Sequence, residues 1–418
     1  MIFDKIKLYG YFNKTSPVVY EAGKSCTNGC ISNKYSDMLK FISKRITDTH
    51  ESIIEHTNFI IVGIIPDKYL KDLLEVVSCC TYLNVHTESI CTNKKSKKIS
   101  ENNATLINIS GSVRGYKNIY RSIKNIYNRV LLEITKLIYR NIPKEYFVDF
   151  ISDEIFDENK FLSNIEFDED SEVEISRYSF NEIDPDNMIN ILNIDDLSII
   201  KAIANIPNEL IIPEAIPDLL TISVQFRDMS RVSTHQLVRH RNGITQESQR
   251  YVDYSNKPII NPITFKPNQY DPNKKYKLTS NKFITYNEEG MTAQELCDAL
   301  QPIYKDLKDQ GMKSEDARYY MGFGASCGSV IMTFTLRHFV KFLELRLASS
   351  AQPEIRKYAK ILFAYMDYIS NDFSSYFINS SHNLFTTILD PEYLKTSTDK
   401  IDPDKISELY PSLEEEIT

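Results

Sequence analysis

Residues 220–252 read LTISVQFRDMSRVSTHQLVRHRNGITQESQRYV, and this stretch decides the fold class. Its first part, LTISVQF, is rich in β-branched and aromatic side chains, which predicts a strand. Ser230 or Asp228 can cap a helix that runs to Arg241, and Gly243 then turns the chain into a polar loop. A short strand leading into a helix predicts an α+β fold, in which a small sheet packs against helices.

The same stretch carries a dense group of cationic side chains. Gln236, Arg239 and His240 have helical i, i+3, i+4 spacing and share one face, whereas Arg241 points elsewhere. Acidic residues are scarce nearby, so these cations would be costly to gather unless an anion neutralised them. Because the planar guanidinium group suits phosphate, the group favours a site for a phosphorylated ligand. A surface salt-bridge cluster is the alternative.

The order strand, helix, strand, long helix occurs in both halves of the chain. Arg114 lies early in the first long helix as Arg337 does in the second, and in the same register Asn118 matches Lys341. This repetition favours a weak internal duplication, with a shared order arising by chance as the alternative. Further strands are predicted at 58–65, 106–109 and 330–334, and further helices at 68–78, 113–140, 293–310, 336–349 and 353–372.

Length and composition set the domain organisation. A chain of 418 residues, 42% hydrophobic and 25% charged, is a globular protein of two or three domains. Carboxylates crowd the segment after Asp149, which predicts a solvated linker or a surface excursion. We expect an N-terminal half at 1–148, this acidic segment at 149–184, a C-terminal half at 185–380 and a tail at 381–418.

Charge and motif content exclude several classes. A net charge of −8 argues against general coating of nucleic acid. Seven cysteines without CxxC or zinc-like spacing indicate a reduced, cytoplasmic chain and predict no metal site. No apolar run reaches the ~20 residues of a membrane helix, and no signal peptide is evident. GASCG at 324–328 fits the hydrolase pattern G-x-S-x-G, but it follows a predicted helix and precedes a strand, so we interpret it as a turn.

The motif RHR at 239–241, a short spacer and QESQRY at 246–251 resemble the signature of the flavin-dependent thymidylate synthase (ThyX) family. The family's spacing is seven residues from RHR to a serine, whereas here six residues separate Arg241 from Ser248. The flanking residues 230–238 resemble the family as well. Further resemblances lie at 314–318 (SEDAR), 333–346 (TFTLRHFVKFLELR), 351–356 (AQPEIR), 50–56 (HESIIEH) and, faintly, 22–25.

The first-half motif HESIIEH is unusually far from RHR for this family. Either an insertion splits a single domain, or each half is a degenerate copy, the first lacking RHR and the second lacking the EH motif. We prefer the second account because the element order is repeated. Family sites form between subunits, so two complementary copies would imitate such an interface, and a homodimer imitating a tetramer, or a homotetramer, is expected. Thr335 and Lys341 depart from the asparagine and the asparagine or histidine that are usual in the family.

The resemblance implies an FAD-dependent enzyme that converts dUMP to dTMP with 5,10-methylenetetrahydrofolate and NADPH, without a cysteine nucleophile. It acts in the cytoplasm, or in the host cytoplasm if viral, without nucleic-acid or membrane partners. A non-catalytic, nucleotide- or flavin-binding paralogue is the alternative. By resemblance, Arg346 polarises the uracil ring and His50 lies near the folate and flavin rings. The implied FAD contacts are Ser25, Ser52, Glu55, Arg239, His240, Arg241, Arg337 and Lys341; the implied dUMP contacts are Gln236, Arg239, Gln246, Glu247, Ser248, Gln249, Arg250, Arg318 and Arg346.

Overall fold

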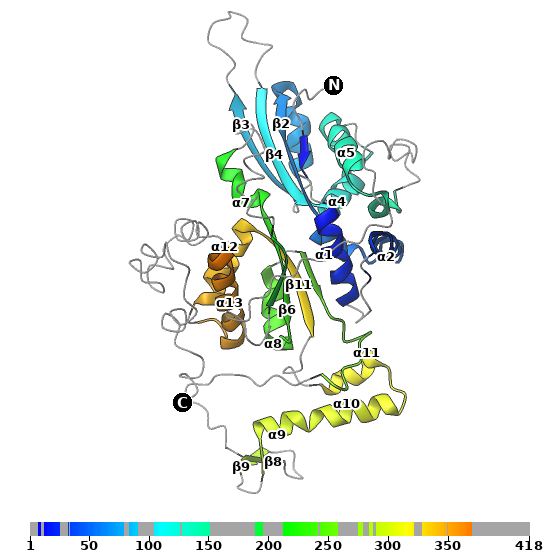
Figure 1. The fold of residues 1–418 in the computed structure, drawn as a ribbon, viewed down its shortest axis with the longest axis vertical. Coiled ribbons are helices and arrows are strands. Elements are labelled where there is room, and N and C mark those ends of the chain that lie inside the picture. The colour runs from blue at the N-terminus through cyan, green and yellow to red at the C-terminus, as the bar shows by residue number, and fades with distance from the viewer. Residues whose placement is uncertain are drawn as a thin grey trace, which may run out of the picture.

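A computed structural model gives the fold of most of the two halves (Figure 1). Within the described residues, no helix is long and apolar enough to cross a membrane. The acidic segment beyond Phe150, the tail, Arg241 and most of the GASCG turn lie outside the described residues. The structure describes residues 7–9, 12–25, 32, 34–78, 83–90, 104–125, 128–150, 189–194, 212–240, 243–257, 275–278, 284–286, 290–321, 328–348 and 350–369.

The first half contains an antiparallel sheet with strand order β1-β2-β4-β3. The pairing of β2 with β4 runs from Asn58 opposite Ser112 to Pro66 opposite Ala104. The predicted strands at 58–65 and 106–109 are confirmed as β2 and β4, although β4 is longer than expected. The strands are β1 (Lys7–Tyr9), β2 (Asn58–Pro66), β3 (Leu83–Ile90) and β4 (Ala104–Ser112).

The second half contains an antiparallel sheet of order β5-β6-β11-β7. When the strands of each sheet are renumbered along the chain, both sheets have the order 1-2-4-3. A duplication predicts this shared topology, and the duplication itself stays a prediction. The strands are β5 (Ile189–Ile194), β6 (Thr221–Arg227), β7 (Gly243–Gln246) and β11 (Ser329–Thr335).

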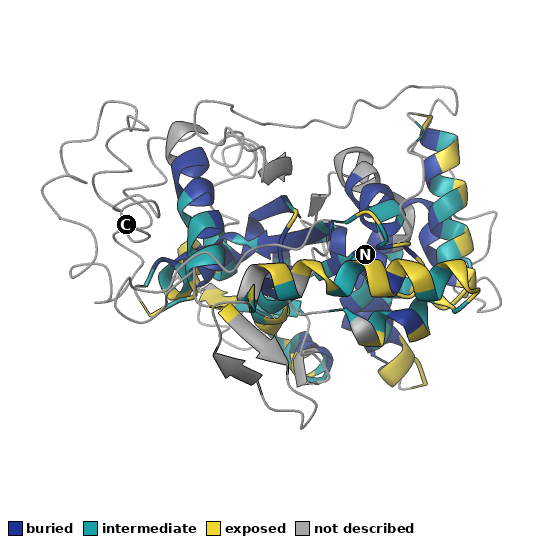
Figure 2. Ribbon diagram, turned by 90° about the horizontal axis from the view of Figure 1, so that it is seen from below, coloured by how far each residue is buried: buried dark blue, intermediate teal, exposed yellow. Residues whose placement is uncertain are grey.

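Helices cover the sheets and bury their apolar faces, which confirms the predicted α+β class. Figure 2 shows the buried residues inside, with exposed residues on the outer sides of the helices. The first half has α1 (Phe12–Ser25), α2 (Tyr35–Thr47), η1 (Glu51–His56), η2 (Asp67–Tyr69), α3 (Leu70–Ser78), α4 (Val113–Ile123), α5 (Arg129–Asn141) and η3 (Lys144–Phe147). The second half has η7 (Pro213–Ala215), α7 (Ile216–Leu219), α8 (Arg231–Leu237), η8 (Val238–His240), α12 (Leu336–Leu347) and α13 (Pro353–Ile369).

A peripheral group of elements lies between β7 and β11 in the sequence and extends below the second sheet in Figure 1. Its longest helix is α10, in which Tyr304 is buried. The group consists of β8 (Lys275–Leu278), β9 (Ile284–Tyr286), β10 (Met291–Thr292), α9 (Ala293–Asp298), α10 (Leu300–Asp309), α11 (Ser314–Ala317) and η9 (Arg318–Tyr320).

Two predictions of a long helix are wrong, because in each case the structure has two shorter helices, with the second beginning inside the predicted range. The predicted helix 113–140 is α4 and α5, because the Asn128 side chain caps the second helix by accepting a hydrogen bond from the Leu131 amide at 2.9 Å. The predicted helix 293–310 is α9 and α10; Pro302 lies in the first turn of α10, where its missing N–H costs no helical hydrogen bond. The Ser230 cap is confirmed, with its hydroxyl 3.2 Å from the Ser233 amide.

The two halves exchange packing elements. From the first half, Val18 and Ala22 of α1 pack against Ile331 of the second sheet. From the second half, Leu219 packs with Val62 and its neighbours in the first sheet. Figure 1 shows α1 on one side of the second sheet, with α12 and α13 on the other. This exchange brings η1 of the first half beside β7 of the second.

Candidate functional site

Most of the HESIIEH motif lies on η1, and η1 contacts β7, the strand that follows the RHR motif. Gly243 begins β7 directly after the RHR segment, and an added Cβ there would lie 2.9 Å from the backbone oxygen of Glu55. Only glycine allows so close an approach without a shift of one backbone. The fold therefore brings HESIIEH beside the strand that follows RHR, although the sequence separates the two motifs by roughly a whole domain.

His56 fastens this contact from inside. Its side chain is fully buried, with Nδ1 2.9 Å from the Thr333 hydroxyl and Nε2 2.9 Å from the Thr245 hydroxyl. Burial lowers the pKa of His56 to about 3, so the imidazole is neutral near pH 7. A neutral ring donates through one nitrogen and accepts through the other, which suits two hydroxyl partners. His56 is thus an interior link between η1 and two strands of the second sheet.

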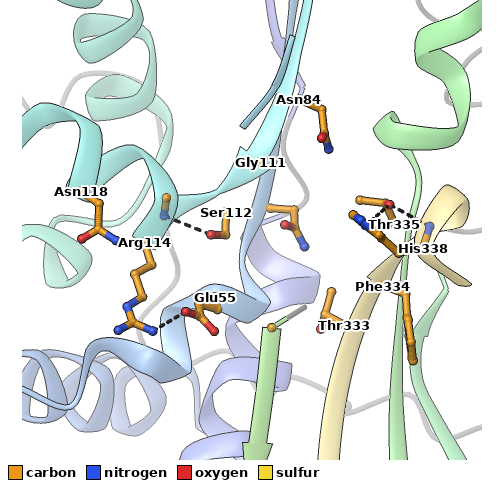
Figure 3. Close-up of a pocket in the computed structure, with 13 residues that line it drawn as sticks. Glu55, Asn84, Gly111, Ser112, Arg114, Asn118, Thr333, Phe334, Thr335 and His338 are labelled. Atoms are coloured by element: carbon orange, nitrogen blue, oxygen red, sulfur yellow. Dashed lines mark hydrogen bonds and ion pairs between the residues drawn. The ribbon is translucent and has the colours of Figure 1, made fainter. Parts of the chain in front are cut away.

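A pocket opens beside this contact and holds about 140 Å³ (Figure 3). Glu55 forms an ion pair with Arg114 at its wall. Burial raises the pKa of Glu55, and the neighbouring Arg114 charge opposes that rise. Both halves contribute to the wall. The lining residues are Glu55, Asn58, Asn84, Gly111, Ser112, Arg114, Gly115, Asn118, Gly243, Thr333, Phe334, Thr335 and His338.

Arg337 and Lys341, both predicted FAD contacts, are absent from this wall. Arg337 instead donates through Nε to both carboxylate oxygens of Asp218, each at 2.9 Å, and through Nη2 to the Glu214 carbonyl at 2.8 Å. Lys341 is exposed. The residues that match them in the first half, Arg114 and Asn118, do line the pocket. The equivalence was visible in the sequence, but only the structure shows which copy faces the pocket.

Arg346 lies on the other side of α12, as its spacing of nine residues from Arg337 predicts. Its Nε donates to His240 Nε2 at 3.0 Å, and its Nη1 and Nη2 donate to the side-chain and backbone oxygens of Gln236, each at 3.2 Å. Burial and the Arg346 charge lower the pKa of His240 to about 4. His240 is therefore neutral near pH 7 and can accept this hydrogen bond. Three predicted site residues thus form one fixed cluster.

Glu247, a predicted dUMP contact in the loop after β7, is buried. Glu247 is 3% exposed and pairs with Lys257 at 3.1 Å, while its amide donates to the Ser329 carbonyl at 2.9 Å. A buried carboxylate held in this way belongs to the loop's own structure. The neighbouring predicted contacts Gln246, Ser248 and Gln249 are half-buried.

Two arginines converge on the same acidic residue at the edge of this loop. Arg250 Nε donates to the Glu315 carboxylate at 3.1 Å, and Arg318 Nε donates to the Glu315 carbonyl at 3.0 Å. The Arg250 amide also donates to the Ser248 hydroxyl at 3.2 Å. These two predicted dUMP contacts are therefore neighbours, although they are far apart in the sequence. Arg239 is exposed.

The remaining predicted residues lie near η1. His50 precedes η1 and is exposed, as is Ser52 on it, and Ser25 is the last residue of α1, which packs against η1. None of the three lines the pocket beside Glu55.

Comparison with known proteins bears on the second half. Residues 215–368 match the Thy1 family model, described as thymidylate synthase complementing protein. The flavin-dependent thymidylate synthase of Saccharolobus solfataricus is 34% identical over 143 residues, which cover 33% of this chain and 46% of that protein. The Pyrococcus furiosus protein of the same name is 32% identical over 151 residues, 35% of this chain and 54% of that protein. The chain thus spans about half the length of these curated relatives.

Two solved structures show weaker similarity. ThyX from Helicobacter pylori, solved with FAD and dUMP, is 17% identical, with 44% of this chain and 81% of that chain covered and a TM-score of 0.27. The UMP/dUMP methylase PolB from Streptomyces cacaoi, bound with 5-Br dUMP, is 16% identical, with 48% and 94% covered and a TM-score of 0.28.

The fold and the pocket define an α+β protein with a polar pocket between its two halves. Residues 215–368 are similar to the flavin-dependent thymidylate synthases.

Proposed function

We propose that this protein is an FAD-dependent thymidylate synthase. It converts dUMP to dTMP with 5,10-methylenetetrahydrofolate as carbon donor and NADPH as reductant. The observation that carries the proposal is the contact between η1, with HESIIEH, and β7, which follows RHR, with Glu55 against Gly243. It supports a ligand site assembled from both halves of one chain.

The residues present fit a flavin nucleotide. The pocket beside Glu55 offers the Arg114 guanidinium, the Asn118 amide and the Ser112 and Thr335 hydroxyls. Cationic and hydroxyl donors are the groups that bind phosphate and ribose oxygens. When bound, the flavin supplies the redox step of the reaction. His50, Ser52, Glu55 and the RHR segment would hold its remaining parts.

Arg346 is the residue to which we assign polarisation of the uracil ring. Gln236 accepts two of its hydrogen bonds and neutral His240 accepts a third, so the guanidinium is oriented before a substrate arrives. A fixed cation beside a developing anion lowers the barrier without reorganisation, commonly the largest single contribution to catalysis. Cysteine nucleophiles have no part in this scheme.

Arg250 and Arg318 are positioned for the dUMP phosphate. Both contact Glu315, whose carboxylate is the Arg250 partner. A phosphate can bind a guanidinium through two oxygens, as a carboxylate can, and it carries more charge, so it can replace Glu315 at Arg250. In this scheme the enzyme is cytoplasmic and assembles as a homodimer or homotetramer.

Rescue of a thymidine-requiring cell line tests the proposal. Wild type and the exposed-site control Lys305→Ala are expected to restore growth, whereas Arg346→Ala abolishes rescue and leaves FAD bound. Growth with Arg346→Ala would refute the role of that residue. A non-catalytic paralogue remains the second candidate, since Arg337 is engaged by Asp218. Purified protein with a yellow flavin spectrum that NADPH bleaches favours the enzyme, and colourless protein that takes up no FAD favours the paralogue.

A further inference from the structure

The two sheets correspond residue by residue at their central strand pairs. Asn58 lies opposite Ser112 in the first sheet, and Thr221 lies opposite Thr335 in the second. Ser112 caps α4 and Thr335 caps α12, through hydrogen bonds of 3.1 and 3.3 Å from the amide three residues on. The second residue of each helix is an arginine. Arg114 therefore corresponds to Arg337, and Asn118 to Lys341.

The acidic partners of these arginines also correspond. Glu55 lies three residues before Asn58, and Asp218 lies three residues before Thr221. Each pairs with the arginine of its own half, Glu55 with Arg114 and Asp218 with Arg337. The molecule thus contains two related ion pairs at two related positions.

The position around Asp218 is closed. Both Asp218 carboxylate oxygens are taken by Arg337, and one of them also lies 2.9 Å from His86 Nε2. The Asp218 backbone oxygen accepts a hydrogen bond from the Ser110 hydroxyl at 2.7 Å, and the residue is 4% exposed. His86 and Ser110 belong to the first sheet. Asp218 and its partners therefore join the halves, which is a structural task.

The position around Glu55 is open. Glu55, Arg114 and Asn118 line the pocket, and the Glu55 side chain is 25% exposed against 5% for Asp218. The arginines do not make this distinction, since the Arg337 side chain is 51% exposed and that of Arg114 is 34% exposed. Gly243 lies opposite Thr333 in the second sheet, and Asn84 lies opposite Ser110 in the first. Gly243 and Asn84 are therefore equivalent positions of the two sheets. The RHR residues precede Gly243 by two to four positions, and the same offsets from Asn84 give Cys80, Thr81 and Tyr82. The first half therefore has no counterpart of RHR at these positions of the sequence.

We propose that the chain binds one flavin nucleotide, with Arg114 and Asn118 of the first half as phosphate-binding residues, and that the related position at Asp218 is a structural clamp. This inference rests on the proposed function and names residues and a stoichiometry that the function alone leaves open. The family resemblance implied that Arg337 and Lys341 of α12 contact FAD. In this proposal Arg337 has a structural role and Lys341 faces solvent, while their first-half counterparts contact the ligand. An incoming phosphate draws Arg114 away from Glu55.

Flavin titration of the full-length protein tests this proposal. Apo protein is titrated with FAD, and bound flavin is counted after gel filtration. We expect one FAD per chain. Arg114→Gln should weaken FAD binding by about 10–100-fold, the worth of a hydrogen bond to a charged group. Asn118→Ala should weaken it by about fivefold, the worth of a neutral hydrogen bond.

The matched variants in the second half give the contrast. Arg337→Gln and Lys341→Ala should keep one FAD per chain with affinity within about twofold of wild type, and Arg337→Gln should lower the melting temperature. Circular dichroism checks that each variant is folded. If Arg114→Gln fails to fold, the comparison of FAD affinity between Asn118→Ala and Lys341→Ala tests the proposal instead. Two FAD per chain, or FAD loss in Arg337→Gln or Lys341→Ala equal to that of their first-half matches, would overturn the inference while leaving the proposed function intact. Wild-type protein that takes up no FAD overturns both.

Discussion

Protonation of His56 in the unfolded chain should lower the stability of the folded protein in mild acid. The ring is fully buried between two threonine hydroxyls, and burial lowers its pKa from 6.5 to about 3. In the unfolded chain the ring takes up a proton near pH 6.5, whereas in the folded protein it stays neutral. The unfolded state therefore binds more protons below pH 6.5, and stability falls as the pH decreases toward 3.

The size of this effect follows from the two pKa values. Between pH 7 and pH 5, preferential protonation of the unfolded state removes about 2 kcal/mol from the free energy of unfolding. Glu51 titrates in a lower window. Burial alone would raise its pKa, but the Arg121 hydrogen bond and the Lys117 charge outweigh burial and lower the pKa to about 2. Its contribution is lost mainly below the unfolded value of 4.5. The pKa values of His240 and His338 are also lowered, so these rings reduce stability in the same window as His56, and the His56 share is the part that His56→Gln removes.

Urea unfolding of wild type and His56→Gln at pH 7 and pH 5 measures the effect. Because the chain has 26 tyrosines and no tryptophan, tyrosine fluorescence or circular dichroism reports unfolding. Glutamine can keep one of the two hydrogen bonds and does not titrate, so His56→Gln should be about 1–3 kcal/mol less stable than wild type at pH 7. The difference should shrink by about 2 kcal/mol at pH 5.

The control is His235→Gln, at an exposed position of α8, which should follow wild type at both pH values. Parallel losses in wild type and His56→Gln between pH 7 and pH 5 would show that His56 is not a buried neutral ring, and the account of the η1 contact would be wrong.

Two other perturbations test the site and its support. In Gly243→Ala, the added Cβ would lie 2.9 Å from the Glu55 backbone oxygen, so β7 must move away from η1. We expect urea unfolding to show about 1–3 kcal/mol of destabilisation, together with weaker FAD binding. Unchanged stability and FAD affinity would contradict the close contact. Lys117→Met removes a fully buried ammonium that pairs with Glu51 at 2.9 Å and with Asp149 at 2.6 Å. The melting curve should show about 3 kcal/mol of destabilisation. Unchanged stability would mean that Arg121 alone satisfies both carboxylates.

The sequence predicted those elements whose signal is local. The central strands β2, β6 and β11 are rich in β-branched and aromatic residues and are buried over most of their length, and each was located within a residue or two. The strand β3 was missed because it is half-buried or exposed over most of its length and carries His, Thr, Glu and Ser. A short polar strand gains its stability from a neighbour, and that neighbour is not visible in its own residues.

The site was predictable in its members more than in its arrangement. Arg346, Gln236 and His240 were all named from the sequence, and the structure brings them together. The role of His56 was not predictable, because its hydroxyl partners lie 189 and 277 residues away. The choice between Arg114 and Arg337 likewise depends on which half faces the pocket, which only the three-dimensional contacts decide.

Ligand binding and folding should be linked in this protein, because the pocket lies on the contact that joins the halves. A ligand that binds only the folded state adds about 2.7 kcal/mol to stability at a hundred times its Kd. This exceeds the roughly 2 kcal/mol that His56 removes between pH 7 and pH 5. FAD at that excess should therefore offset the His56 share of the loss and raise the urea midpoint at pH 5, provided that the Kd is measured at pH 5. If saturating FAD leaves the midpoint unchanged, the flavin does not bind at this junction of the folded halves.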